Sequence, residues 1–445
     1  MNQPTRATGL GRRYLLQTSL GVAGSLAMFR QALAVENHPA LGTYPAGVSG
    51  NTAFIGITTP LTGPYSADGQ DHQLGYELAI ELINAGSPIV HKWGLTGNGV
   101  LGKTIHYKVA DSQTKPNVAV QAQTGFIQND KAIMITGCVS SATAIALEEL
   151  AQREKVLNMV GLSGSNDTTG KNCQRYGFRS QPSAYMAAKA LAPVLAKHLG
   201  KNLKAAYLVP DYTYGHSVYK SMKEFTEAEG WKSVSEQLVP LGTKDFSPTL
   251  LNIANSGADV FVNIAFGGDA VISTQQAGHF GILKKMKYVV PNISQFQAKE
   301  LGADIMAGTY GTQAWWWTEQ DTYPLAKYFV AEFDKKFGYK PRWGASEIYL
   351  QMVVWADAVE RAGTFYPVAV IEALEAGHKL DTIAGEVWYR AGDHQMVRSV
   401  PVMVGKARSA MKSPEDYYDV LELVPGEKVL PPLAETGCHM QPLRT

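Results

Sequence analysis

The stretch Ala53–Asn84, AFIGITTPLTGPYSADGQDHQLGYELAIELIN, indicates the fold of this 445-residue chain. Its apolar start, 53–58, is typical of a buried strand, and a loop rich in proline and glycine follows at 59–69. Apolar residues at helical spacing between 74 and 83 then predict a helix. Strand, polar loop and helix form the first unit of a parallel α/β sheet, which places ligands in the loops at the carboxyl ends of its strands. The loop contains Tyr65, Ser66, Asp68 and Gln70, so we predict that it forms one wall of a small-molecule cleft.

The first 34 residues have the pattern of an export signal. Arg12-Arg13 precedes a charge-free run at 14–29, and Ala32-Leu33-Ala34 forms a small-x-small cleavage site. The run is too short to anchor the chain in a bilayer. The paired arginines and mild hydrophobicity are typical of a twin-arginine (Tat) signal, but Gly11 stands where Ser or Thr is usual, so a Sec signal remains an alternative. We expect cleavage near Ala34 and a periplasmic location.

The charge balance excludes some classes of partner. Removal of residues 1–34 takes away four arginines and no acid, which leaves 36 basic against 39 acidic residues. No basic block is present, which argues against nucleic acid or an anionic membrane as the main partner. A hydrophobic content of 45% is ordinary for globular proteins, and the length favours two or three domains. We expect a monomer.

Three cysteines, Cys138, Cys173 and Cys438, allow at most one disulfide. Disulfides persist in exported proteins. Cys173 lies in a polar loop and Cys438 near the end of the chain, so we predict a bridge between them that ties down the C-terminal tail. Cys138 follows a strand in apolar surroundings and is predicted to be a buried free thiol.

Strand and helix patterns alternate along the chain. The first series has strands at 104–110, 132–136 and 156–162, with helices at 116–128 and 144–155. A second series starts after 178–183, with strands at 205–209, 233–240, 259–265 and 287–290 and helices at 185–198, 216–230, 246–256 and 270–280. Such alternation predicts βαβ units around a parallel sheet, and two series in tandem predict two lobes. We expect the two lobes to share the helices at 325–337 and 346–362 and the strand at 385–389.

Two motifs resemble catalytic signatures without fulfilling them. The G-x-G-x-x-G match at 97–102 precedes a strand and opens no helix, so it predicts a turn rather than a dinucleotide site. The segment GLSGS at 161–165 has Ser where a nucleophile elbow has its second Gly. The histidines are scattered without a metal-binding spacing. We therefore predict no cofactor, no metal and no enzymatic activity.

Polar loops that follow a strand and open a helix recur instead. Ser140-Ser141 and the segment 163–167 offer hydroxyl groups beside the unpaired backbone N–H groups of a helix start, which suit a carboxylate. The alternative is that these serines only cap their helices. Aromatic residues supply the apolar walls of such sites, and Tyr65, Tyr214, Phe266 and one of the tryptophans at 315–317 are candidates. For Phe266, core packing is the alternative.

The segment GITTPLTGP at 56–64 resembles the first strand and loop of the leucine/isoleucine/valine-binding-protein family, the type I periplasmic solute receptors of ABC importers. Further matches follow in the order expected: Gly137…Ser140-Ser141, Phe178-Arg179-Ser180, Asp211…Tyr214-Gly215 and Gly267-Gly268. The resemblance covers residues 52–404. It implies an α/β fold of two Rossmann-like lobes with parallel sheets, joined by three crossovers near 180–183, 308–312 and 381–384. Lobe 1 would comprise 50–180 and 311–381, and lobe 2 would comprise 181–310 and 382–445.

The resemblance also implies a set of ligand-binding residues. Mapped onto this sequence, with Gln295 as a further candidate from a strand-end loop, they are Tyr65, Asp68, Ser140, Ser141, Ser163, Ser165, Tyr214, Phe266, Asp269 and Gln295. Amino-acid-binding members have an acidic residue after the strand that ends here at Val290, and it binds the ammonium group. This chain has Asn292 to Phe296 there without an acid. Either Asp269 takes that role, or the ligand lacks an amino group, as an aromatic or aliphatic carboxylate or an amide such as urea would.

The main functional prediction is a periplasmic substrate-binding protein that captures a small amino-acid-like or aromatic-carboxylate ligand and delivers it to an inner-membrane ABC permease. A second hypothesis is that the same clamp reports its ligand to a membrane sensor or chemoreceptor. A third is an exported α/β hydrolase.

Overall fold

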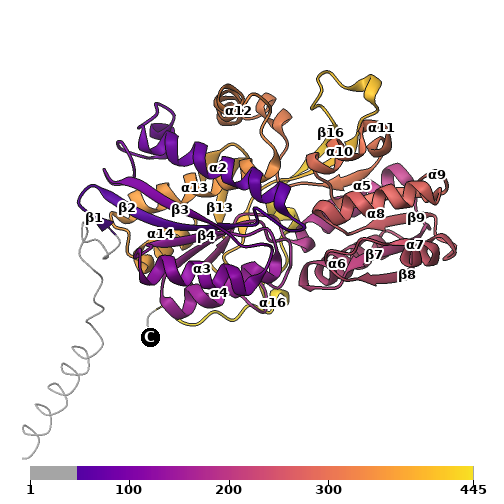
Figure 1. Ribbon diagram of the computed structural model, residues 1–445, viewed down its shortest axis with the longest axis horizontal. Helices are drawn as coiled ribbons and strands as arrows, with labels where there is room; N and C mark the ends of the chain where they lie inside the picture. Colours follow the sequence, from indigo (N-terminus) through magenta and orange to yellow (C-terminus); the bar gives the residue numbers. More distant parts are fainter. Residues whose placement is uncertain (1–47, 444–445) are drawn as a thin grey trace, which may run out of the picture. The chain divides into compact units, whose positions relative to one another are not determined.

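The computed structural model describes residues 48–443, and the predicted signal segment at 1–34 lies outside them. A first sheet has the strand order β1-β2-β4-β5-β6, with β3 also paired to β2 (Figure 1). All of its pairs are parallel except the short β1–β2 pair. Its strands are β1 (Val48–Ser49), β2 (Thr52–Thr59), β3 (Thr104–Asp111), β4 (Met134–Gly137), β5 (Leu157–Val160) and β6 (Gly177–Arg179). Helix α2 (Ser66–Asn84) lies on one face, and α3 (Pro116–Gln128) and α4 (Ser141–Glu154) lie on the other.

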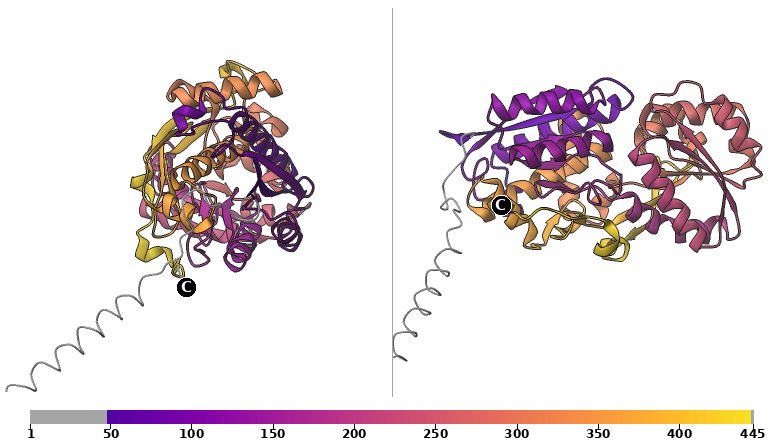
Figure 2. Two further views of the ribbon diagram at one scale, coloured as in Figure 1. Left: turned by 90° about the vertical axis from the view of Figure 1, so that its left-hand side faces the viewer. Right: turned by 90° about the horizontal axis from the view of Figure 1, so that it is seen from below.

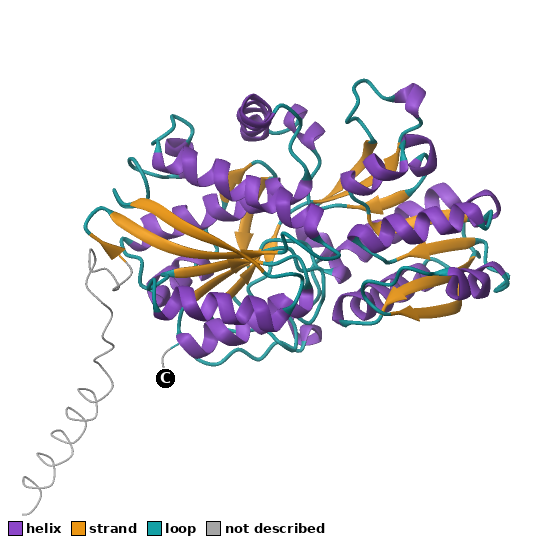
Figure 3. Cartoon of the chain, in the orientation of Figure 1, coloured by secondary structure: helices purple, strands orange, loops and turns teal. Residues whose placement is uncertain are grey.

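A second sheet has the order β16-β15-β11-β10-β9-β7-β8. The strands β7 (Lys204–Pro210), β8 (Lys232–Val239), β9 (Val260–Asn263), β10 (Lys287–Asn292) and β11 (Tyr310–Thr312) are parallel, whereas β15 (Val400–Gly405) and β16 (Tyr418–Val424) are antiparallel. The helices α5 (Ala184–Leu199) and α6 (Thr213–Ala228) pack with one core. The helices α7 (Ser247–Ala254), α8 (Gly267–His279), α9 (Ile282–Lys285), α10 (Gln295–Leu301) and α11 (Ala303–Met306) pack with another. Helices thus cover both faces (Figure 3).

After β11 the chain returns to the first sheet. It forms η2 (Trp317–Asp321), α12 (Pro324–Phe337), α13 (Trp343–Ala362), α14 (Pro367–Glu375) and a small sheet of β12 (Leu380–Thr382), β13 (Gly385–Tyr389) and β14 (Met396–Val397). These elements share one hydrophobic core with the first sheet, and Figure 2 shows them in orange beside its indigo and magenta strands. We call the first sheet with 313–398 lobe 1, and the second sheet with its helices lobe 2.

The third crossing between the lobes differs from the predicted one. Residues 382–397 were assigned to lobe 2, but Ile383, Val387, Tyr389 and Met396 are buried in the core of lobe 1. The chain crosses to lobe 2 only between β14 and β15. The reason is the apolar pattern of this hairpin, whose side chains pack into the core of lobe 1 rather than against lobe 2.

Helix α13 is buried along almost its whole length and packs on α2. Gly75 of α2 permits this, because a Cβ atom there would clash with the backbone of Ala345. Asp71 of α2 accepts a hydrogen bond from Ala345 N at 2.8 Å and thereby caps the start of α13. This contact fixes the position of Trp343, the first residue of α13.

The remaining elements are short: η1 (Val90–Trp93), η3 (Arg408–Ala410), α15 (Gly426–Val429) and α16 (Leu433–Thr436). Residues 97–102 form a turn bridged between Val100 and Lys103 before β3, as the sequence predicts. Cys173 and Cys438 form a disulfide, the pairing that the sequence favours, and Cys138 is a buried free thiol. Within 48–443, no helix has the length and apolar character needed to cross a bilayer.

Candidate ligand-binding site

The loops at the carboxyl ends of both sheets enclose a small pocket between the lobes. It is lined by Val139, Ser141, Leu162, Gly164, Gln181, Tyr212, Tyr214, Phe266, Asn292 and Trp343. A second pocket continues from it and shares Gly164, Gln181, Tyr214 and Asn292. Its far wall is apolar and is formed by alanines of α5 together with Val218 and Met222 of α6. The strand-end loops therefore meet where the topology of parallel sheets places a ligand.

Aromatic rings from both lobes form the centre of the site. Phe266 of lobe 2 packs edge-on against Tyr65 and Trp343 of lobe 1, with ring centroids 5.4 and 5.7 Å apart. Tyr214 lies 6.4 Å from Phe266. The hydroxyl groups of Tyr65 and Tyr212 are hydrogen-bonded at 2.7 Å across the lobes. Burial raises the pKa of Tyr65, Tyr212 and Tyr214 above the usual value, so these phenols are neutral at physiological pH.

Further hydrogen bonds join the lobes on both sides of the pocket. Gly268 N donates to Pro64 O at 3.2 Å. Ser165 Oγ lies 2.9 Å from Ser217 Oγ, and Asn166 Nδ2 donates to Ser221 Oγ at 3.0 Å. The two lobes are therefore closed on each other in this structure.

Three of the predicted ligand residues line the pocket: Ser141, Tyr214 and Phe266. The others lie nearby with different roles. Ser163 Oγ is 2.6 Å from Thr168 Oγ1, and Ser165 joins the lobes. Ser140 occupies the N-cap position of α4 but makes no side-chain capping bond. Gln295, the first residue of α10, is buried, and its Oε1 has no hydrogen-bond partner among the described residues.

Neither predicted acid lines the pocket. Asp269 Oδ2 accepts a hydrogen bond from Gly242 N at 2.7 Å, so its carboxylate holds the loop before α7. Asp68 lies in the first turn of α2 and is 4% exposed. Burial, and then the neighbouring carboxylate of Asp71, raise the pKa of Asp68 to about 7. The residues that line the pocket include no acidic and no basic side chain.

The tryptophans at 315–317 do not reach the pocket either. Trp315 is buried in the core of lobe 1 and donates from Nε1 to Ile383 O at 3.0 Å. Trp316 packs on Tyr418 in the core of lobe 2. The tryptophan at the site is Trp343 instead.

Four of the polar and aromatic residues that line the pocket were not predicted from the sequence: Gln181, Tyr212, Asn292 and Trp343. Gln181 lies in the first crossing, and its Oε1 is buried without a partner among the described residues. Asn292 ends β10, and its side chain is hydrogen-bonded to the hydroxyl of Tyr214. The position of Asn292 at a strand end was the available signal, as it was for Tyr212. Trp343 follows no strand, so no pattern in the sequence marked it.

A buried arginine shapes one wall. Arg179, at the end of β6, is 1% exposed. It donates to the carbonyl oxygens of Ser163 (3.1 Å) and Ser165, to Thr169 Oγ1 at 2.5 Å and to Gln395 Oε1 at 2.8 Å. Burial lowers its pKa to about 10, which still leaves the guanidinium charged at neutral pH. Arg179 therefore fixes the loop that contains Gly164 through hydrogen bonds to the backbone on both sides of this glycine.

In the described part of the chain, no three His, Cys, Asp or Glu side chains are grouped so that they could hold a metal ion. What the arrangement offers is a closed chamber with aromatic walls, hydroxyl and amide groups, and the start of α4. Two hinged α/β lobes closing on such a chamber define the class of bilobed solute-binding proteins.

Comparison with known proteins identifies the family within this class. The model of the periplasmic binding protein family matches residues 52–410, and the chain belongs to this family. A Leu/Ile/Val-binding protein homolog of Brucella suis is 27% identical over 337 residues, which cover 72% of this chain and 80% of the relative.

Solved structures agree with this assignment. A periplasmic binding protein of Burkholderia mallei has a TM-score of 0.78 at 26% identity and covers 87% of this chain and 98% of its own. An amino acid ABC transporter substrate-binding protein of Pseudomonas fluorescens Pf-5 has a TM-score of 0.77 at 26% identity, with 88% and 100% covered. The chain is therefore a substrate-binding protein of the ABC-transporter type, a family of the periplasm.

Proposed function

We propose that this protein captures a small ligand that has a carboxylate or amide group on an aromatic or other apolar body and lacks an ammonium group. The observation that carries the proposal is the lining of the pocket, which combines aromatic rings with hydroxyl and amide groups and contains no acid. An ammonium group buried without a carboxylate partner would be costly. Asp269 accepts a hydrogen bond from Gly242 N, and Asp68 is buried near Asp71 and Arg342, so neither acid predicted from the sequence lines the pocket.

Ser141 is the proposed centre for the carboxylate or amide. It is the first residue of α4, where backbone N–H groups have no partner within the helix. The helix dipole adds a favourable field for negative charge at this end. Gln181 and Asn292 provide neutral hydrogen-bonding groups opposite, and Phe266, Tyr214 and Trp343 enclose the apolar body.

Ligand capture would be followed by delivery to an inner-membrane ABC permease. Opening at the three crossings admits the ligand, and closure brings Tyr214 and Phe266 against Ser141 and excludes water. We place the mature protein in the periplasm as a monomer without catalytic turnover. Ser163, the candidate nucleophile of a hydrolase, is 1% exposed and bonded to Thr168.

The proposal is tested by a thermal-shift screen of mature residues 35–445 against free amino acids, aromatic acids, short carboxylates and amides. A ligand at a hundredfold excess over Kd stabilises the folded state by about 2.7 kcal/mol, which gives a measurable shift in Tm. We expect shifts with acids or amides that lack an amino group. Ser141→Ala should weaken binding of such a hit about tenfold. Ser247→Ala, at the start of α7 and away from the pocket, should not change it.

The names of the relatives favour a second candidate, an amino acid ligand. Shifts only with free amino acids would establish it and would contradict the proposed ligand class. Asp68→Asn and Asp269→Asn would then show which carboxylate reaches the ammonium group.

A further inference from the structure

The C-terminal tail starts on lobe 2. Strand β16 belongs to the sheet of lobe 2, and α15 follows it directly and packs on α5. Val429 is buried in the core that α5 and α6 share, and Leu430 packs against the same core. The chain is therefore anchored to lobe 2 as far as Leu430.

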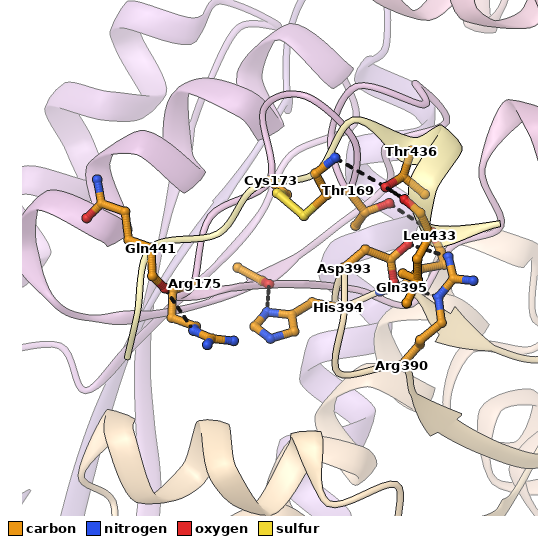
Figure 4. Close-up of a disulfide and its surroundings, with 12 residues drawn as sticks. Thr169, Cys173, Arg175, Arg390, Asp393, His394, Gln395, Leu433, Thr436 and Gln441 are labelled. Carbon is orange, nitrogen blue, oxygen red and sulfur yellow. Dashed lines mark hydrogen bonds and ion pairs between the residues drawn. A yellow bond between two sulfur atoms is a disulfide. The ribbon is translucent and has the colours of Figure 1, made fainter. Parts of the chain in front are cut away.

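From the next residue onward the tail contacts lobe 1 (Figure 4). Arg390, in the turn after β13, donates from Nη1 to Pro431 O at 2.8 Å. The side chain of Leu433 covers Gly392 of the same turn, where an added Cβ would lie 2.7 Å from it. Cys438 is bonded to Cys173, and Arg175 Nε donates to Gln441 O at 3.1 Å. Leu443 packs against the core of lobe 1.

The tail passes beside an open cleft to which both lobes contribute. Its walls include Asn166 and Lys171 of lobe 1 and Lys220 and Glu224 of α6 in lobe 2, and Pro431, Glu435 and Thr436 of the tail line it as well. The short step from Leu430 to Pro431 thus lies at the boundary between the lobes. Any motion that separates the lobes at this cleft pulls on the tail.

We propose that residues 425–443 form a strap, a fourth connection between the lobes that limits how far they open. The three crossings are chain connections that permit hinge motion. The strap is different because its far end is fixed to lobe 1 by a disulfide. If the contacts of 431–437 peel away, the bond at Cys438 still holds the tail, and a chain extends by at most about 3.5 Å per residue. A restrained open state has less conformational entropy, which favours the closed state.

The strap has a second consequence for the site. The turn that Leu433 and Pro431 hold is followed by Gln395, which accepts from Arg179 and donates from Nε2 to Gln181 O at 3.0 Å. The tail therefore supports the first crossing, where Gln181 lines the pocket. This inference concerns the range of motion of the lobes and does not depend on the identity of the ligand.

The test measures the distance between spin labels on the two lobes in the protein without ligand, by pulsed electron paramagnetic resonance. Two exposed residues, Lys92 of lobe 1 and Lys201 of lobe 2, are replaced by cysteine. The spin labels are attached to these two cysteines. Two variants release the strap differently. Cys173→Ser with Cys438→Ser removes the disulfide. An insertion of about six Gly and Ser residues between Leu430 and Pro431 keeps the disulfide but adds about 13 Å of reach. The same insertion after Gly377, where nothing lies within 4 Å of an added Cβ, is the matched control.

We expect both strap variants to broaden the distance distribution toward longer distances, and the control insertion to leave it unchanged. Unchanged distributions in both variants would overturn the proposal. A change with the serine pair alone would also overturn it, because the disulfide would then act only within lobe 1. A change with the insertion alone would overturn the role of the disulfide. Since the insertion leaves the disulfide intact, the test does not depend on the folding of the serine variant, and failure to find a ligand does not affect it.

Discussion

Asp68 shows how a single side chain can depart from the role that its position suggests. It sits at the start of α2 beside Tyr65, where a contact with ligand was predicted. The fold instead buries its carboxyl group near Asp71 and Arg342, and Oδ2 has no hydrogen-bond partner among the described residues. Burial raises its pKa from 3.8 to about 7.

This pKa leads to a prediction about stability and pH. Because the pKa in the folded state lies above that of the unfolded chain, the folded state holds a proton that the unfolded chain has lost between about pH 4 and pH 7. Protonation of Asp68 therefore stabilises the fold at low pH, and this contribution is lost as the pH rises through about 7. Asp68→Asn should be more stable than the wild type at pH 8, by at most about 4 kcal/mol, and nearly equal at pH 4.

Urea denaturation at pH 4, 6 and 8 measures this difference. Asp304→Asn serves as the control, because Asp304 is 72% exposed and its carboxylate contacts only the side chain and backbone N–H of Arg408 at the surface. A wild type and an Asp68→Asn variant with parallel pH profiles would contradict the assignment.

At the scale of elements, closure of the lobes brings a glycine against an aromatic ring at two places. Gly164, in the loop after β5, faces Tyr214 of α6, and an added Cβ would lie 2.9 Å from the ring. Gly267, at the start of α8, faces Tyr65, where the corresponding distance is 2.7 Å. Gly267 also has a φ of +57°, which disfavours other residues.

We predict that Gly164→Ala weakens ligand binding about tenfold or more while leaving each lobe folded. The added methyl group meets Tyr214 only when the lobes are closed, so the closed state alone loses stability. Isothermal titration with a hit from the ligand screen measures the affinity, and circular dichroism checks the fold. Gly97→Ala is a suitable control, since nothing lies within 4 Å of a Cβ there. Equal affinity of the Gly164→Ala variant and the wild type would show that the lobes do not close at this point.

At the scale of the whole molecule, a buried ion pair ties the crossings together. Arg398, just before β15, is paired with Glu347 of α13 at 2.5 Å, and the two side chains are 1% and 0% exposed. Arg398 Nη2 also donates to Ala314 O at 2.7 Å, in the second crossing. The second and third crossings are therefore fixed to one helix of lobe 1.

Arg398→Leu should destabilise the protein by about 3–5 kcal/mol, because it leaves Glu347 charged and unpaired in the core. The double variant Arg398→Leu with Glu347→Leu should recover much of this loss, since no buried charge then remains. Urea unfolding of the wild type, both single variants and the double variant gives the coupling energy. Additive effects of the two substitutions would mean that the pair does not interact.

The site could be predicted only where it follows the strand-end rule. Ser141, Tyr214 and Phe266 all lie directly after parallel strands, and alternation of strands and helices was enough to place such loops at one edge of a sheet. Asn292 and Tyr212 also lie at the ends of parallel strands. Of the residues after Val290, however, the sequence prediction selected Gln295 and not Asn292. Trp343 starts a helix, and Gln181 lies in a crossing, so neither had a local signal.

The sequence by itself determined the α/β class, the two series of units and the family, because these depend on local periodicity and on ordered motifs. Counting limited the three cysteines to one disulfide, and their positions in the chain favoured the pairing of Cys173 with Cys438. Only the tertiary structure decided where the third crossing lies, which acids are withdrawn from the pocket and which tryptophan enters it. Those features depend on how elements far apart in the chain pack. The sequence assigns residues 382–397 to lobe 2, but the fold buries their apolar side chains in the core of lobe 1. The carboxylate of Asp269 is a candidate ligand group in the sequence, but the fold brings Gly242 N within hydrogen-bonding distance of it.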